Sequence, residues 1–156
     1  PTSEYIPSSW DNRHILSLTA TRKLGLWDIG MKWRFTNGAP FTPYDLETSS
    51  LIAAWDVKRQ PYLDYSRFNS ERASSFHQLD IRVDRSFYFK KWSLILYADI
   101  QNIYNHKTKS PDLLVPQENS DGSYKIDPER PDHYLMRYIK NDTGSLLPSV
   151  GIIVEF

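Results

Sequence analysis

The chain has 156 residues and no cysteine, and its 19 basic and 19 acidic residues give a formal net charge of zero. The lack of cysteine excludes a disulfide framework, a thiolate metal site and a thiol nucleophile, and the balanced charge gives no basic excess that would indicate nucleic-acid binding. No run of 18 apolar residues is present, so no segment of the sequence qualifies as a membrane-spanning helix.

Alternation between apolar and polar residues predicts five β-strands. The predicted strands span residues 14–24, 27–36, 76–89, 92–104 and 147–156. The second strand is the clearest, because every second residue from Trp27 to Phe35 is apolar and the residues between them are polar or glycine. Strands of about 9 to 14 residues exceed the five or six that are typical of soluble proteins, and they suit a tilted strand that crosses a bilayer.

The connections between these strands alternate between short and long. Two-residue turns at residues 25–26 and 90–91 join neighbouring strands, whereas residues 37–75 and 105–146 form long loops. Short periplasmic turns on one side and long extracellular loops on the other are typical of an outer-membrane barrel. Within the second loop, an Asp-Gly pair predicts a short hairpin over residues 111–126.

The two-residue turns also fix which residues lie opposite one another. They place Lys23 opposite Asp28, and Arg82 opposite Asp99, on the polar face of the strands. We interpret these as charge pairs that span strands along a water-filled lumen, in preference to catalytic acid–base groups. The polar residues expected to face the lumen are Asp28, Lys32, Arg34, Asp80, Arg82, Asp84, Asp99 and Gln101.

Aromatic residues gather near the ends of the predicted strands. Phe89 and Trp92 lie beside a short turn, and Phe35 and Tyr104 lie beside long loops. Aromatic girdles at both membrane interfaces are typical of outer-membrane barrels. A soluble β-sandwich would also carry aromatic residues in its core, but it would not need the other face of its strands to be charged along the whole length.

No catalytic or metal-binding constellation is visible in the sequence. The histidines His14, His77, His106 and His133 lack the spacing of metal ligands. There is also no glycine-rich phosphate loop and no nucleophile elbow. We therefore expect neither enzyme activity nor a cofactor.

Several aromatic residues of the long loops are candidate contacts for a ligand or for a lid protein. Aromatic rings in wet sites commonly stack on sugars or peptides, and the alternative is packing against neighbouring loops. These residues are Tyr44, Trp55, Tyr62, Tyr65, Tyr124 and Tyr134.

From about residue 10 to its end, the chain resembles the C-terminal end of the β-barrel of TonB-dependent outer-membrane receptors. The resemblance is to the large branch that imports glycans and peptides with a surface lipoprotein lid. The matching stretches are WDNRHILSLTATRKL, WDIGMKWRFTNGAPFTPYD, FHQLDIRVDRSFYFKKWSLILYADIQNIYN and PSVGIIVEF, and their order and spacing carry the resemblance.

The resemblance implies an all-β fold in the bacterial outer membrane, with these strands as the last five of an antiparallel transmembrane β-barrel of about 22 strands. It implies four partners: the remainder of the barrel and its plug, outer-membrane lipid, a surface lipoprotein lid, and a TonB-type energy coupler that acts through an N-terminal part missing here. It also implies that the last strand carries a barrel-assembly signal at Phe156, Val154, Ile152 and Val150.

Five strands are too few to form a barrel. Bacterial single-chain barrels have even strand counts, and an open sheet edge in lipid leaves unpaired backbone groups. Residues 1–13 also lack the features of a signal peptide. We therefore expect this sequence to be the C-terminal part of a larger exported protein.

Three functions stay open from the sequence. The leading expectation is part of an outer-membrane importer of a nutrient such as a glycan or peptide, for which this segment supplies barrel wall, lumen lining and extracellular loops. The second is a non-transporting barrel scaffold in an outer-membrane assembly or surface complex. The third is a soluble β-sandwich binding domain.

Overall fold

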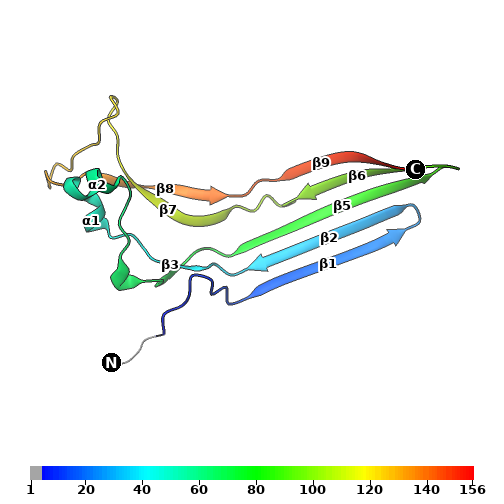
Figure 1. The fold of residues 1–156 in the computed structure, drawn as a ribbon, viewed down its shortest axis with the longest axis horizontal. Helices are drawn as coiled ribbons and strands as arrows, with labels where there is room; N and C mark the ends of the chain where they lie inside the picture. The colour runs from blue at the N-terminus through cyan, green and yellow to red at the C-terminus, as the bar shows by residue number, and fades with distance from the viewer. Residues whose placement is uncertain (1–4) are drawn as a thin grey trace. The chain divides into compact units, whose positions relative to one another are not determined.

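Five strands form one antiparallel sheet in the order β1-β2-β5-β6-β9 (Figure 1). The computed structural model describes residues 5–156. The strands are β1 (Ile15–Leu24), β2 (Trp27–Thr36), β5 (Phe76–Tyr88), β6 (Ser93–Gln101) and β9 (Leu147–Glu155). Their bounds fall within one residue of the predicted ones, except at the end of β6.

Strand β6 ends three residues earlier than the sequence predicts. Asn102 has a φ of 54°, in the left-handed region that a strand cannot contain. Its side-chain Nδ2 donates to the carbonyl oxygens of His106, at 2.9 Å, and Ser145, at 3.3 Å. In the sequence, the alternation continues past Asn102 to residues such as Ile103, and the predicted strand is therefore too long. In the structure, Asn102 turns the backbone and ends the strand.

Both predicted two-residue turns are present. Gly25 adopts a φ of 62°, which glycine reaches without steric cost, and the register pairs Leu24 directly with Trp27. At the other turn, the Phe89 N–H donates to the carbonyl of Trp92 at 2.9 Å. Both turns therefore lie at the same end of the sheet, which we call the short-turn end.

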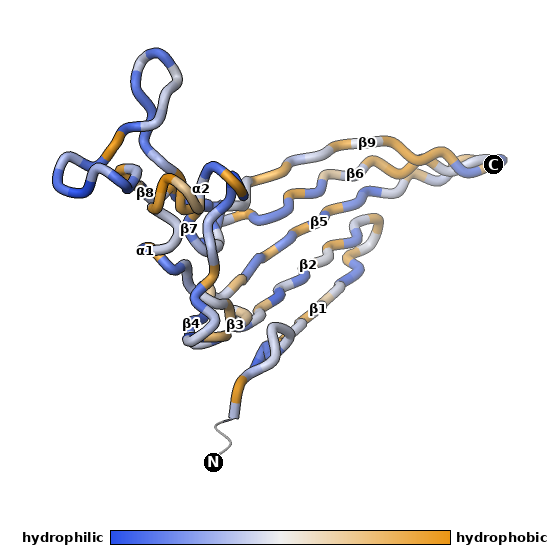
Figure 2. The backbone as a smooth tube through the Cα atoms, turned by 60° about the vertical axis from the view of Figure 1, so that its left-hand side comes forward, coloured by the Kyte–Doolittle hydropathy of each residue, from blue (hydrophilic) through white to orange (hydrophobic). Residues whose placement is uncertain are grey.

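The register places polar and apolar side chains on opposite faces of the sheet, and Figure 2 shows their alternation along the strands. The apolar face includes the following residues: Leu16, Leu18, Ala20, Leu24, Trp27, Ile29, Met31, Trp33, Phe35, Leu79, Ile81, Val83, Phe87, Leu94, Leu96, Ala98, Ile100, Val150, Ile152 and Val154. The polar face carries all eight residues predicted to face a lumen.

The chain divides into two units. The sheet unit comprises residues 12–37, 75–108 and 142–156, and the loop unit comprises residues 38–74 and 109–141 together with the segment that ends at Asp11.

The long connections contain regular structure that the alternation of apolar and polar residues does not reveal. They hold two short helices, a 3₁₀ turn and two pairs of strands. These are β3 (Pro40–Phe41), α1 (Leu46–Ser50), α2 (Ile52–Lys58), η1 (Tyr65–Arg67), β4 (Glu71–Arg72), β7 (Thr108–Pro116) and β8 (Met136–Thr143). None of the helices within residues 5–156 is long and apolar enough to cross a membrane.

The hairpin predicted over residues 111–126 is present in a shorter form. Gly122 has a φ of 83°, and Glu118 and Tyr124 form an antiparallel bridge across the turn. The preceding segment instead belongs to β7, which pairs with β8. The alternation in this region is too weak to identify the more distant partner strand.

The two units differ in what they bury. The buried hydrophobic side chains Trp55 and Leu114 both belong to the loop unit. In the five strands of the sheet, Ser86 is the single buried residue, and every apolar side chain there is partly or fully exposed. The loop unit thus has a small hydrophobic core, and the sheet has none.

Candidate functional surfaces of the sheet and loop units

The polar face of the sheet has a central ion pair. The guanidinium of Arg34 lies 3.2 Å from a carboxylate oxygen of Asp80 on the neighbouring strand. The Asp80 carboxylate also accepts from Gln78 Nε2 at 2.6 Å and from the Asn102 N–H at 3.0 Å. Only 15% of the Asp80 side chain is exposed, and its carboxylate accepts from three donors.

The register confirms that Arg82 lies opposite Asp99, but the predicted ion pair between them is wrong. The Arg82 guanidinium instead contacts Asp84 of its own strand, with an Nη2–Oδ1 distance of 2.7 Å and Nε contacts of 3.0 Å to both carboxylate oxygens. The Arg82 Cζ atom also lies 4.4 Å from the ring centre of Tyr97, which stands opposite Asp84. The ring and the carboxylate together hold Arg82 along its own strand.

The predicted pair at the first turn is present, but it is loose. Lys23 Nζ lies 3.8 Å from Asp28 Oδ2, and both side chains are largely exposed. An exposed pair of this kind contributes at most about 1 kcal/mol. It therefore neutralises charge more than it stabilises the sheet.

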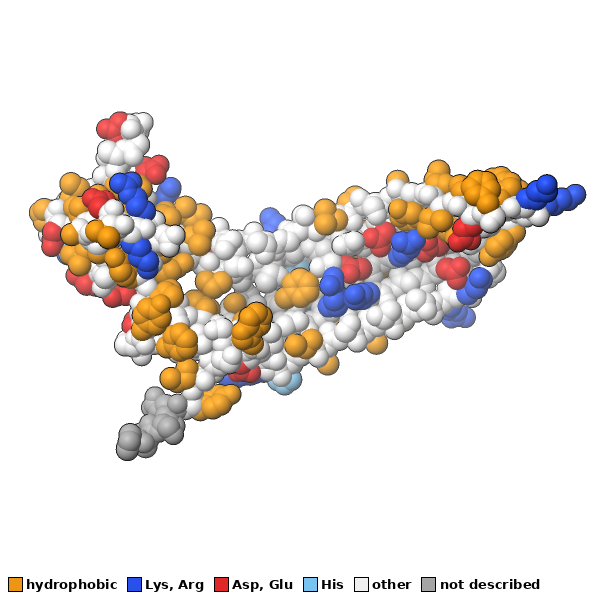
Figure 3. Space-filling view, in the orientation of Figure 1, with side chains coloured by type: hydrophobic (Ala, Val, Ile, Leu, Met, Phe, Trp, Pro, Cys, Tyr) orange, Lys and Arg blue, Asp and Glu red, His pale blue; other side chains and the backbone are white. Residues whose placement is uncertain are grey.

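Four strands line an open hollow of about 360 Å³ on the polar face. Its walls combine cations, carboxylates, hydroxyls and an amide. The lining residues are Thr19, Thr21, Gly30, Met31, Lys32, Arg34, Asp80, Arg82, Asp99 and Gln101. Figure 3 shows acidic and basic side chains gathered along this part of the sheet. Most of these lining residues carry charged, hydroxyl or amide groups, which suits water and polar solutes.

The apolar face is partly or fully exposed along the whole sheet. Leu18 and Ile152, on the two edge strands, are 55% and 66% exposed, and Leu96 in the interior is 40% exposed. No other strand or helix of the sheet unit covers these side chains. The four residues implied as an assembly signal, Val150, Ile152, Val154 and Phe156, are exposed as well.

The loop aromatics divide into buried and exposed members. Trp55 is only 4% exposed and meets the ring of Tyr124 edge-on, so Trp55 packs within the loop unit and is unavailable for a direct ligand contact. Tyr124 in turn packs edge-on against Tyr134, whose hydroxyl donates to Asp56 at 3.1 Å. For these three aromatic residues, the structure therefore agrees with the alternative that loop aromatics pack against neighbouring loops.

The remaining loop aromatics lie nearer to solvent. The Tyr62 hydroxyl donates to the carbonyl of Ala54 at 3.3 Å, and Tyr65, which is 71% exposed, stacks on Phe68. Tyr44 and Phe68 line a groove of about 750 Å³ within the loop unit. This groove has the size and the aromatic lining of a small-molecule site.

The loop unit contains a charged cluster that has no local signature in the sequence. His133, which is 5% exposed, lies between two carboxylates, with Nε2 3.1 Å from Glu47 and Nδ1 2.9 Å from Asp132. Arg130 donates to the same Glu47 at 2.9 Å. The hydrogen bond with His133 is the main reason why the pKa of Asp132 is lowered from its ordinary value. Because Glu47 lies more than 80 residues from these partners, no local pattern could reveal the cluster.

A second histidine cluster lies in the sheet unit. The rings of His77 and His106 stack with their centres 3.6 Å apart, and His77 Nδ1 lies 2.9 Å from the Tyr104 hydroxyl. Stacked imidazoles point their nitrogen lone pairs in parallel and do not converge on one ion. Across residues 5–156, no group of three or more histidine and acidic side chains is arranged to hold a metal ion.

Comparison of the chain with models of known protein families, with curated proteins and with solved structures gives no match.

Proposed function

We propose that the sheet unit is a segment of the wall of a transmembrane β-barrel in the bacterial outer membrane, and that the barrel belongs to a TonB-dependent importer. One observation carries the proposal. The sheet is apolar and uncovered on one face and charged on the other, over five antiparallel strands in continuous register.

The uncovered apolar face is best accounted for by lipid. A soluble β-sandwich covers such a face with a second sheet about 10 Å away, and the resulting core is buried. The sheet unit has no second sheet, and side chains such as Leu18 and Leu96 stay exposed. In a bilayer, hydrocarbon chains would cover this face, and the aromatic residues at the strand ends would lie at the interfaces.

The two edge strands support a larger assembly. Among residues 5–156, strand β1 pairs only with β2, and β9 pairs only with β6. An open edge in hydrocarbon leaves backbone N–H and C=O groups without partners, at a cost of several kcal/mol for each group. The proposal therefore requires further strands, from the same protein or from another chain, that pair with β1 and β9.

The polar face would line the interior of the barrel. Its hollow contains the paired charges Arg34 and Asp80 and the exposed Lys32, which suit a water-filled passage for a polar solute. Both long connections leave the sheet at the end opposite the turns, as extracellular loops of a barrel do. The import of a glycan or peptide, the lid and the energy coupler rest on the resemblance to TonB-dependent receptors.

Site-directed spin labels test the membrane placement. In the full-length protein in lipid vesicles, labels at Leu18 and Leu96 should be relaxed by lipid-soluble oxygen. Labels at Thr19 and Gln101, on the polar face, should be relaxed by a water-soluble nickel reagent. A water-like response at both apolar positions would refute the barrel.

Import is tested separately in cells. Disruption of the gene should abolish growth on at least one glycan or peptide source that the wild-type strain uses, and loss of the proton-motive force should stop uptake of that source. A strain that inserts the protein normally but shows neither dependence would favour the non-transporting scaffold.

A further inference from the structure

Two arginines interrupt the apolar face near the short-turn end of the sheet. Arg85 lies opposite Trp27 on one neighbouring strand and Leu96 on the other, and Arg22 lies opposite Ile29. Both arginines are exposed. The register thus places two permanent positive charges on the surface that the proposed function assigns to lipid.

Neither arginine has a carboxylate partner among the described residues. The three acidic side chains near this end lie on the polar face and already have partners there. Asp28 pairs with Lys23, Asp84 pairs with Arg82, and Glu155 accepts from Ser93 at 3.1 Å. No acidic side chain at this end is therefore left to balance Arg22 and Arg85, and an anion from outside the protein can do so.

The surroundings of Arg85 hold its side chain among aromatic rings. Its guanidinium lies 4.7 Å from the ring centre of Trp27 and 5.0 Å from that of Phe87. Nearer the turn, the rings of Phe89 and Trp92 stack with their centres 4.1 Å apart. At this end, Figure 3 shows hydrophobic side chains together with basic ones that extend beyond them. Aromatic rings of this kind mark the headgroup level of a membrane.

We infer that Arg22 and Arg85 bind the phosphates of anionic glycerophospholipids in the leaflet at the short-turn end. This inference rests on the proposed function, because it needs lipid against the apolar face. A guanidinium offers paired N–H donors that match two phosphate oxygens, and its long stem can lie along apolar surface while the charged head reaches the headgroups. The two uncompensated charges favour a lipid with net negative charge over a zwitterionic one.

Native mass spectrometry of the full-length protein tests this inference. The protein is released from detergent micelles that contain equal amounts of phosphatidylglycerol and phosphatidylcholine, and the retained lipids are counted. The wild-type protein should retain phosphatidylglycerol preferentially, and the double variant Arg22→Gln/Arg85→Gln should retain roughly tenfold less of it. The matched control Lys32→Gln removes one positive charge from the polar face and should leave retention unchanged.

Three outcomes would overturn the inference. The first is that the double variant retains as much phosphatidylglycerol as the wild type. The second is that Lys32→Gln lowers retention as much as the double variant does. The third is that millimolar inorganic phosphate displaces the lipid, which would indicate a site for small anions. If the double variant does not fold, the single variants Arg22→Gln and Arg85→Gln should each lower retention in part. Spin labels at Leu18 and Leu96 separate the two proposals: a lipid response there with unchanged retention refutes the headgroup site alone.

Discussion

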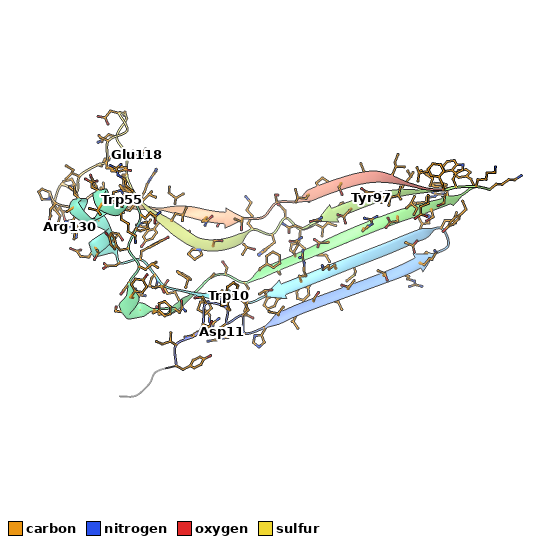
Figure 4. All side chains as sticks on the ribbon, in the orientation of Figure 1. Trp10, Asp11, Trp55, Tyr97, Glu118 and Arg130 are labelled. Atoms are coloured by element: carbon orange, nitrogen blue, oxygen red, sulfur yellow. The ribbon has the colours of Figure 1, made fainter. Side chains whose placement is uncertain are left out.

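The ring of Tyr97 in β6 lies directly against Gly151 in β9, its partner in the register. A Cβ atom added at Gly151 would overlap three atoms of this ring. Figure 4 shows Tyr97 on the strand beside β9. With Arg82 packed on Tyr97, the glycine allows a layer of strand, ring and guanidinium to form on the polar face.

Replacing Gly151 by alanine should therefore destabilise the protein. The ring must move away from β9, and overpacking of this kind typically costs about 1–3 kcal/mol. The urea midpoint of the folded full-length protein measures the effect. Gly30→Ala is the matched control, because the nearest atom to its added Cβ is Thr21 Cγ2, at an ordinary 3.7 Å. Equal midpoints for the two variants would contradict the packing role of Gly151.

Away from the short-turn end, the apolar face should reject charge. Replacing Leu18 by arginine is expected to cost about 2–4 kcal/mol if the residue lies near the bilayer midplane. Unfolding of the full-length protein from lipid vesicles gives the value. Thr19→Arg, on the polar face, should cost far less, and similar losses at both positions would count against lipid contact at Leu18.

Arg72 should hold the segment before Asp11 in place. Its guanidinium donates to the carbonyls of Asp11, at 2.8 Å, and Gly38, at 3.1 Å, and pairs with the Asp11 carboxylate at 2.5 Å. Figure 4 labels Asp11 on this segment. Arg72→Gln should cost about 1–3 kcal/mol locally and make residues 5–11 cleavable by proteases. Arg67→Gln breaks an exposed pair with Glu71 and should leave cleavage unchanged.

Helix α1 should lose stability in acid through Asp45. Its side chain accepts from the Thr48 hydroxyl and from the Thr48 N–H at 3.0 Å, and these bonds lower the pKa of Asp45 from its ordinary value of 3.8. Because the pKa is lower in the folded state, this stability is present above about pH 3.8 and is lost as the pH falls through the lower folded value. Hydrogen exchange over residues 46–50, corrected for its intrinsic pH dependence, reports the loss.

Two variants of Asp45 separate the cap from the charge. Asp45→Asn keeps a good N-cap and removes the titration, so exchange should become independent of pH in this window. Asp45→Ala removes the cap and should cost about 0.5–2 kcal/mol at neutral pH. A pH dependence that persists in Asp45→Asn would assign the acid effect to another group.

The sheet could be predicted from the sequence because its turns are short. A two-residue turn fixes which residues of the two strands lie opposite one another. Lys23 must therefore lie opposite Asp28. The alternation does not specify with which of several nearby carboxylates an arginine forms an ion pair. Arg82 prefers Asp84 because the ring of Tyr97 holds the guanidinium beside its own strand.

The loop unit could not be predicted, because contacts between distant residues determine it. The helices are five and seven residues long, too short for a periodic pattern to identify. Trp55 is buried by Tyr124, nearly 70 residues away, and an aromatic residue in a polar loop gives no local sign of such burial. Local signals do predict the turn at Gly122, where Asp-Gly is itself the determinant.

The contacts within the loop unit limit how such loops can be exchanged between related proteins. Arg72 reaches 61 residues back to Asp11, Asn69 donates to Pro7 across 62 residues, and Glu47 holds Arg130 and His133 across 83 and 86 residues. Each of the three sequence segments thus contributes partners to another. A chimera that takes a single loop would leave charged groups such as Glu47 or Arg72 without partners, whereas a transplant of all three segments together would keep the unit intact. The loop unit is therefore one structural module, although three separate segments of the chain form it.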